Sequence, residues 1–281
     1  MEAVVTAQQP VIKVAALCGS LRKASFNRGL IRSAMQLVKD SVKGMEIEYV
    51  DIAPLPMLNT DLEVNGTYPP VVEAFRQKIL QADCYLFASP EYNYSVSGPL
   101  KNAIDWASRP PNVWADKAAA IVSAGGGFGG GRAQYHLRQI GVYLDLHFIN
   151  KPEFFLNAFQ PPAKFDSDGN LIDEQSKEQL KAVLLALKAF TLRLQAFGLA
   201  KLQEDKFHDL QQHLRPPISR PWVANRSGSG SSSTLPPFLP TPVSIPRSAT
   251  PLLQRQVPFL RKTAHDSSNA RASRPWPLLQ L

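Results

Sequence analysis

The feature that most constrains the fold is an alternation of short apolar runs with longer stretches of helical periodicity along the first 200 residues. The apolar runs are rich in valine, isoleucine, leucine, alanine and phenylalanine throughout, which is typical of strands covered on both faces. Such a chain builds βαβ units around a parallel sheet, so we predict an α/β fold. The predicted strands are Val11–Leu17, Glu46–Asp51, Cys84–Ala88, Ala118–Ser123 and Leu146–Ile149.

Between the strands, apolar residues recur at spacings of three and four, which predicts amphipathic helices. The predicted helices cover residues 27–42, 71–81, 97–108, 132–144 and 174–195. With right-handed crossovers, we expect a flavodoxin-like doubly wound sheet of five strands in the order 2-1-3-4-5. Ligands of such folds bind outside the carboxyl ends of the strands, where the strand order reverses. The loops after the first, third and fourth strands are therefore the candidate site.

The loop after the first strand, residues 19–27, reads Gly-Ser-Leu-Arg-Lys-Ala-Ser-Phe-Asn and enters a helix. Hydroxyls at Ser20 and Ser25, the guanidinium of Arg22 and the free N–H groups of a helix N-terminus together favour a phosphate. An ordinary loop with helix-capping residues explains Ser25 and Asn27, but not the Gly-Ser-x-Arg before them. The chain has neither a P-loop nor a G-x-G-x-x-G motif after this strand, so a single phosphate is the better match.

The loop after the third strand contains Pro90, Glu91, Tyr92, Asn93 and Tyr94. Two tyrosines on either side of an amide can hold a planar heteroaromatic ring and cover one of its faces. The alternative interpretation is a well-capped turn whose aromatic side chains only pack.

The loop after the fourth strand has six glycines in the seven positions 125–131, preceded by Ser123. Glycine is costly in chain entropy, so this composition indicates close approach of the backbone to a ligand, with a flexible hinge as the alternative.

These three motifs, in this order, resemble the NADPH-dependent FMN reductase family over about residues 11–196, and most nearly its plant NAD(P)H:quinone oxidoreductases. The resemblance implies a flavodoxin-like fold, one FMN per subunit, and homodimers that pair into homotetramers. It assigns Ser20, Arg22, Ser25 and Asn27 to the FMN phosphate, with a backbone N–H from Phe26. It places the isoalloxazine ring along Pro90, Glu91, Tyr92, Asn93 and Tyr94, with its far edge at Ser123, Gly125, Gly126 and Gly127.

The implied activity is the two-electron reduction of quinones by NADPH or NADH, suited to quinone detoxification. The nicotinamide passes a hydride to flavin N5, leaves, and is replaced by the quinone, so the kinetics are expected to be ping-pong. No catalytic side chain and no metal are expected, because the chain lacks G-x-S-x-G and H-E-x-x-H motifs and its histidines have no metal-binding spacing. Two alternatives stay open: a reductase of FMN, azo dyes or metal ions, and a non-catalytic flavodoxin-type electron carrier.

The remainder of the chain has a different composition. Residues 201–281 hold 12 of the 24 prolines, a serine- and glycine-rich run and a net charge of +7, whereas residues 1–200 have a net charge of +1. We therefore expect a flexible N-terminus over 1–10, one reductase domain over 11–197 and a disordered tail over 198–281. The near-neutral domain has no basic stripe, so nucleic acid is not an expected partner.

Cys18 and Cys84 lie in apolar strand contexts without disulfide spacing, which predicts buried, inert thiols in a reducing compartment. The chain shows no signal peptide and no apolar stretch long enough for a membrane span. We accordingly expect a soluble, cytoplasmic protein.

Overall fold

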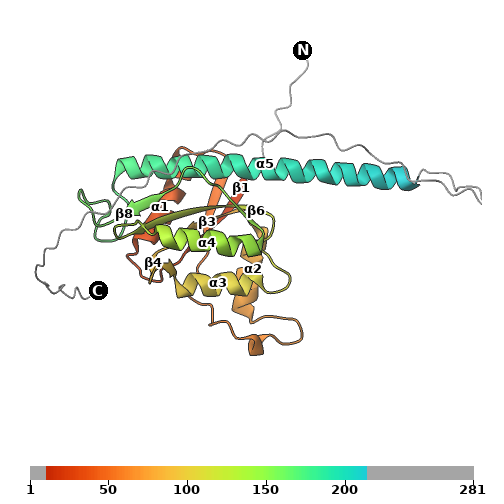
Figure 1. The fold of residues 1–281 in the computed structure, drawn as a ribbon, viewed down its shortest axis with the longest axis horizontal. Coiled ribbons are helices and arrows are strands. Elements are labelled where there is room, and N and C mark those ends of the chain that lie inside the picture. Colours follow the sequence, from red (N-terminus) through yellow and green to blue (C-terminus); the bar gives the residue numbers. More distant parts are fainter. Residues whose placement is uncertain (1–10, 214–281) are drawn as a thin grey trace, which may run out of the picture. The chain divides into compact units, whose positions relative to one another are not determined.

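The computed structural model describes residues 11–213 and confirms a flavodoxin-like α/β fold (Figure 1). Five parallel strands lie in the order β2-β1-β3-β6-β7, which is the predicted order 2-1-3-4-5. In chain order they are β1 (Ile12–Cys18), β2 (Met45–Tyr49), β3 (Cys84–Ala88), β6 (Lys117–Gly125) and β7 (Leu146–Phe148).

The edge strand is split into two pieces. β7 pairs with the first residues of β6, and β8 (Phe155–Asn157) pairs with Ser123–Gly125 at the other end of β6. The sequence predicts only the first piece, because the interruption contains Pro152, which cannot donate to a strand ladder. β8 is nevertheless important for the site, since it supports the last residues of β6.

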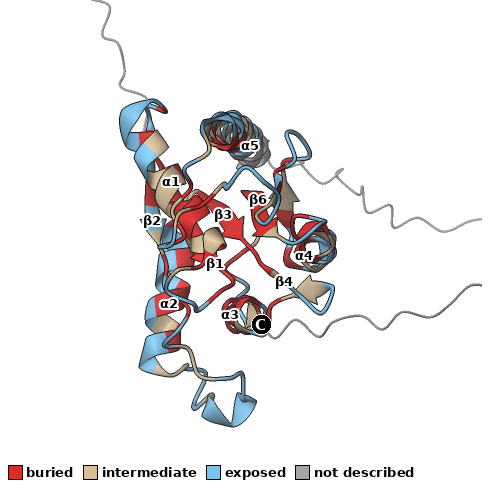
Figure 2. Cartoon of the chain, turned by 90° about the vertical axis from the view of Figure 1, so that its left-hand side faces the viewer, coloured by how far each residue is buried: buried red, intermediate tan, exposed pale blue. Residues whose placement is uncertain are grey.

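Helices cover both faces of the sheet. The core on one face combines α1 (Phe26–Asp40) and α5 (Glu174–His213) with every second strand residue, such as Val14 and Ala16. The opposite core combines α2 (Pro70–Gln81), α3 (Gly98–Ser108) and α4 (Gly131–Leu144) with the alternate strand residues. Figure 2 shows the buried strands between these two layers. β1, β3 and β6 carry buried apolar residues on both faces, as continuous apolar runs predict. β2 differs, because buried Met45 and Ile47 alternate with exposed Glu46 and Glu48.

The fifth helix is longer than predicted. Its expected end at Gln195 is wrong, because α5 continues to His213. Residues 199–213 are mostly good helix formers without proline, and a single Gly198 costs only about 1 kcal/mol in a helix. The expected start of the tail at residue 198 therefore falls inside α5, whereas 1–10 and 214–281 lie outside the described residues.

The connection between β2 and α2 carries a short 3-10 helix, η1 (Thr60–Leu62), and is fastened to α3. Asn102 accepts from the N–H of Leu58 and donates to the carbonyl of Pro56, and the Trp106 indole donates to the same carbonyl. Among the described residues, no helix is both long enough and apolar enough to cross a membrane.

Candidate cofactor site

The three predicted loops meet at the carboxyl ends of β1, β3 and β6. The N–H of Gly19 donates to the Ala88 carbonyl over 2.9 Å, and the N–H of Ser89 donates to the Val122 carbonyl over 3.1 Å. These bonds extend the sheet by one residue into the loops. The topology thus brings together motifs that are about 100 residues apart in the sequence.

The first loop is built as an anion-binding turn at the start of α1. Ser25 is the N-cap of the helix and its hydroxyl accepts from the N–H of Arg28, while Ser20 and Ser25 are both buried. The N–H groups of Phe26 and Asn27 belong to the first turn, where no helix carbonyl precedes them. They can bind a phosphate together with the positive end of the helix dipole.

Arg22 stands at the exposed side of this turn. Its guanidinium carbon lies 5.5 Å from the centre of the Phe26 ring, and Phe26 stacks on Phe165 at 4.5 Å. Within residues 11–198, no carboxylate lies within ion-pair distance of Arg22. Its charge is therefore available to an anion bound at the turn.

Asn27 is engaged differently from the sequence expectation. Its side-chain amide donates to the carbonyl of Ala124 over 2.9 Å and accepts from the N–H of Ala124 over 3.0 Å. Asn27 is only 3% exposed. The structure thus directs this amide to the last residues of β6, while the backbone N–H of Asn27 stays at the anion turn.

The second loop is a small antiparallel ribbon of β4 (Glu91–Tyr92) and β5 (Ser95–Val96), which follows Pro90. Its two turn residues, Asn93 and Tyr94, both have positive φ, 50° and 66°. This is the geometry of a type I′ turn, which usually contains glycine. Tyrosine is rare in this conformation, and such backbone outliers concentrate at functional sites.

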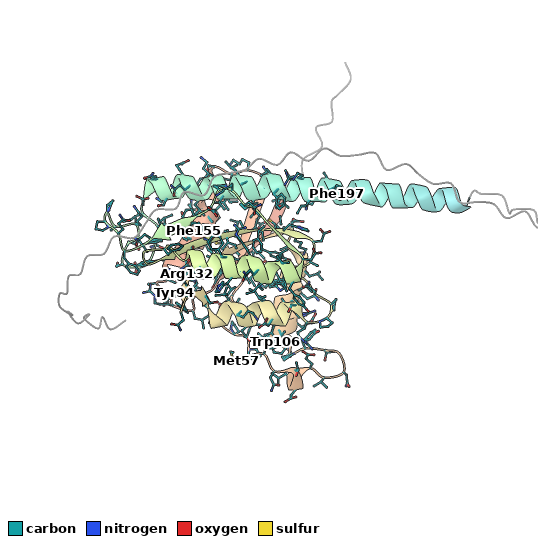
Figure 3. All side chains as sticks on the ribbon, viewed as in Figure 1. Met57, Tyr94, Trp106, Arg132, Phe155 and Phe197 are labelled. Atoms are coloured by element: carbon teal, nitrogen blue, oxygen red, sulfur yellow. The ribbon has the colours of Figure 1, made fainter. Side chains whose placement is uncertain are left out.

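Glu91 connects this ribbon to α4. Its carboxylate accepts from the N–H of Arg132 over 2.9 Å and pairs with the guanidinium of Arg132 over 3.1 Å. That guanidinium lies 4.2 Å from the Tyr94 ring centre and 4.5 Å from the Phe128 ring centre. Figure 3 shows Tyr94 and Arg132 next to each other. The Glu91 side chain is therefore occupied, which leaves the backbone of the ribbon to address a ligand.

The third loop is held from inside by Ser123, which is fully buried. Its hydroxyl donates to the carbonyl of Gly129 over 2.6 Å and accepts from the Gln134 amide over 2.7 Å. Gly130 has φ +83°, and a Cβ there would lie 2.7 Å from the Ser123 Cβ, so only glycine fits.

Gly126 and Gly127 differ from the other glycines of this loop. A Cβ at either position would have no atom of the chain within 4 Å, whereas one at Gly125 would lie 3.2 Å from the N of Gly130. The two glycines therefore border open space at the edge of the site. A flat ligand can approach their backbone closely because no side chain covers it.

Two supporting side chains are not apparent from the sequence. Ser97 is buried at the N-cap of α3, and its hydroxyl donates to the carbonyl of Gly19 over 2.6 Å. Gln134 is fully buried and also donates to the carbonyl of Phe154. Their sequence positions, at a helix start and after the glycine loop, do not reveal these roles, because each side chain binds the backbone of a segment distant in sequence.

The thiols agree with the sequence expectation, since Cys18 and Cys84 are both free and buried. Burial raises the pKa of Cys18, which ends β1 directly below the anion turn. Burial likewise raises the pKa of Cys84 to about 12. Both sulfurs are therefore protonated at neutral pH and unsuited to nucleophilic or redox work.

These observations fit FMN. The first turn offers hydroxyls, N–H groups and one free guanidinium for a single phosphate, and Gly126 and Gly127 leave room for a flat ring beside the tyrosine ribbon. A five-stranded 2-1-3-4-5 sheet with an anion turn after its first strand defines a flavodoxin-like protein.

Comparisons with known proteins place the chain more narrowly. Residues 12–161 match the model of the family described as NADPH-dependent FMN reductase. An NAD(P)H:quinone oxidoreductase of Solanum tuberosum is 81% identical over 188 residues, which are 67% of this chain and 97% of that relative. An NADPH:quinone oxidoreductase of Arabidopsis thaliana is 77% identical over 195 residues, 69% of this chain and 99% of the relative.

Among solved structures, the flavoenzyme NAD(P)H:(acceptor) oxidoreductase FerB from Paracoccus denitrificans superposes with a TM-score of 0.55 at 31% identity, covering 66% of this chain and 98% of that one. The chain belongs to the NADPH-dependent FMN reductase family.

Proposed function

We propose that this protein is an FMN-dependent oxidoreductase that uses NAD(P)H to reduce quinones by two electrons, a reaction suited to quinone detoxification. The observation that carries the proposal is the convergence of the anion turn, the tyrosine ribbon and the glycine loop on one edge of the sheet. The names of the relatives at 81% and 77% identity supply the quinone as acceptor.

The proposed roles of the residues follow from their positions. FMN supplies the redox chemistry when bound. The hydroxyls of Ser20 and Ser25, the guanidinium of Arg22 and the N–H groups of Phe26 and Asn27 hold its phosphate.

The backbone of 90–94, together with Ser123 and Gly125–Gly127, would hold the isoalloxazine ring. No side-chain acid, base or nucleophile is assigned. The nicotinamide and then the quinone would use the same open side of the site, next to Gly126 and Gly127, where an added Cβ would meet no atom of the chain within 4 Å.

We further propose that the protein forms homodimers that pair into homotetramers in the cytoplasm. The support for assembly is the exposed surface of α4, where Val142 is 81% and Tyr143 89% exposed. Two such side chains next to each other suit a contact with a second copy of the chain. The two free buried thiols suit a reducing compartment.

The test is steady-state oxidation of NADPH and NADH by purified, FMN-loaded protein, with and without a benzoquinone. Fast turnover that depends on the quinone supports the proposal. Equal turnover with free FMN, an azo dye or a metal ion alone would favour the broader reductase, and no turnover with bound FMN would favour an electron carrier. Truncation after Phe197, within α5, tests whether the site needs any residue from 198 onward, and FMN content should then be retained.

A further inference from the structure

The last residues of β6 extend beyond the end of β3, its neighbour in the sheet. β3 pairs with β6 up to Ala88 and Val122, and the N–H of Ser89 then donates to the Val122 carbonyl. The next residue is Pro90, which has no N–H, and the chain turns away into the tyrosine ribbon. β6 continues to Gly125 without a strand on that side.

The bonds of the neighbouring residues show which way Ala124 faces. Ser123 donates its N–H to the Phe154 carbonyl, and Gly125 accepts from the N–H of Ala158, so both face the β8 side. Successive residues of a strand direct their peptide groups to opposite neighbours. The N–H and carbonyl of Ala124 therefore face the position that β3 has left.

Asn27 fills that position. Its side-chain amide presents an N–H donor and a carbonyl acceptor on the same side, and it binds both the N–H and the carbonyl of Ala124. Asn27 and Ala124 are 3% and 4% exposed, so water cannot easily replace these bonds. The side chain therefore takes the place of the missing strand.

We infer that Asn27 is a positioning residue for the isoalloxazine end of the cofactor site, acting through Ala124 on Gly125–Gly127, and that its side chain is not a phosphate ligand. This inference rests on the proposed FMN site. Asn27 stands in the first turn of α1, so one residue couples the phosphate end of the site to the ring end.

The experiment compares the affinities of the full chain for FMN and for riboflavin, which lacks the phosphate. Asn27→Ala should weaken both ligands by a similar factor, about tenfold, because two buried peptide groups lose their partners. It should also change the visible circular dichroism of bound FMN. Arg22→Ala is the matched control and should weaken FMN far more than riboflavin.

A second variant covers the case in which Asn27→Ala does not fold. In Asn27→Asp, an ionised carboxylate faces the Ala124 carbonyl, but a protonated carboxyl group can donate to it and accept from the N–H as the amide does. Riboflavin affinity of this variant should therefore recover as the pH falls from about 7 to about 5, with little change in the unaltered protein.

Two results would overturn the inference. A loss of FMN affinity in Asn27→Ala with riboflavin affinity unchanged would make the side chain a phosphate ligand, and no loss of either would remove its role. Failure of the unaltered chain to bind FMN at all is a different result, because it would overturn the proposed function as well.

Discussion

The carboxylate of Glu91 caps the N-terminus of α4 by accepting from the backbone N–H of Arg132 over 2.9 Å, although the two residues are 41 positions apart. The helix has no cap of its own, since its N-cap is Gly130, which has no side chain to accept a bond. A residue of the predicted ring-binding loop therefore also fixes the helix that follows the glycine loop.

This cap gives a first prediction. Glu91→Ala should lower the free energy of unfolding of the flavin-free protein by about 1 kcal/mol, which corresponds to a melting temperature lower by roughly 2–4 °C. Glu91→Gln keeps an oxygen acceptor for the N–H of Arg132 and should lose less. Calorimetry of the three proteins is the measurement, and an unchanged melting temperature in Glu91→Ala would show that the cap contributes nothing.

The anion turn gives a second prediction. Arg22→Ala should reduce FMN affinity ten- to a hundredfold, since a charge-assisted bond contributes about 1.5–3 kcal/mol. Lys23 is the next residue and is also exposed, so Lys23→Ala is the matched control for a loss of positive charge near the turn. Fluorescence titration with FMN measures both. Equal effects of the two substitutions would indicate general attraction rather than a defined phosphate contact.

Two substitutions in the glycine loop give a third prediction, because one should affect only ligand binding and the other only the stability of the fold. In Gly126→Val the new side chain would enter open space, so the free energy of unfolding of the flavin-free protein should change by no more than about 0.5 kcal/mol. The variant should nevertheless bind FMN poorly. Gly130→Ala should instead destabilise the flavin-free protein, because φ is +83° and the new Cβ would contact Ser123. Normal FMN content in Gly126→Val would place the ring elsewhere.

Much of this architecture is predictable because it depends on local patterns. The number and order of the parallel strands and the presence of a helix after Ser25 follow from apolar runs, a capping residue and connection rules, although α1 begins at Phe26, one residue before the predicted Asn27. The type I′ ribbon was not predictable, because neither Asn93 nor Tyr94 is the glycine that normally marks such a turn.

Other features depend on where distant segments meet. Asn27 is compatible with a helix cap, a phosphate ligand or a structural bond, and only the position of Ala124, 97 residues later, selects the third. The same applies to Glu91 and Arg132. The continuation of α5 beyond Gln195 was not predicted for a different reason. Gly198 interrupts the apolar periodicity of the sequence, yet one glycine costs a helix only about 1 kcal/mol.

Assembly gives a fourth prediction. Tyr143→Glu on α4 should shift the protein toward smaller species in sedimentation velocity, because a charge would be buried in the proposed contact. Leu185→Glu is the control, since Leu185 is 48% exposed on α5, which covers the other face of the sheet. A protein that is monomeric and fully active before any substitution would contradict the proposed tetramer.

In the proposed reaction one open side of the site serves the donor and the acceptor in turn, which steady-state kinetics with varied NADPH at several fixed quinone concentrations can test. We expect parallel lines in double-reciprocal plots, because the oxidised nicotinamide must leave before the quinone can bind beside Gly126 and Gly127. Intersecting lines would show that both substrates occupy the protein together and would rule out a shared binding face.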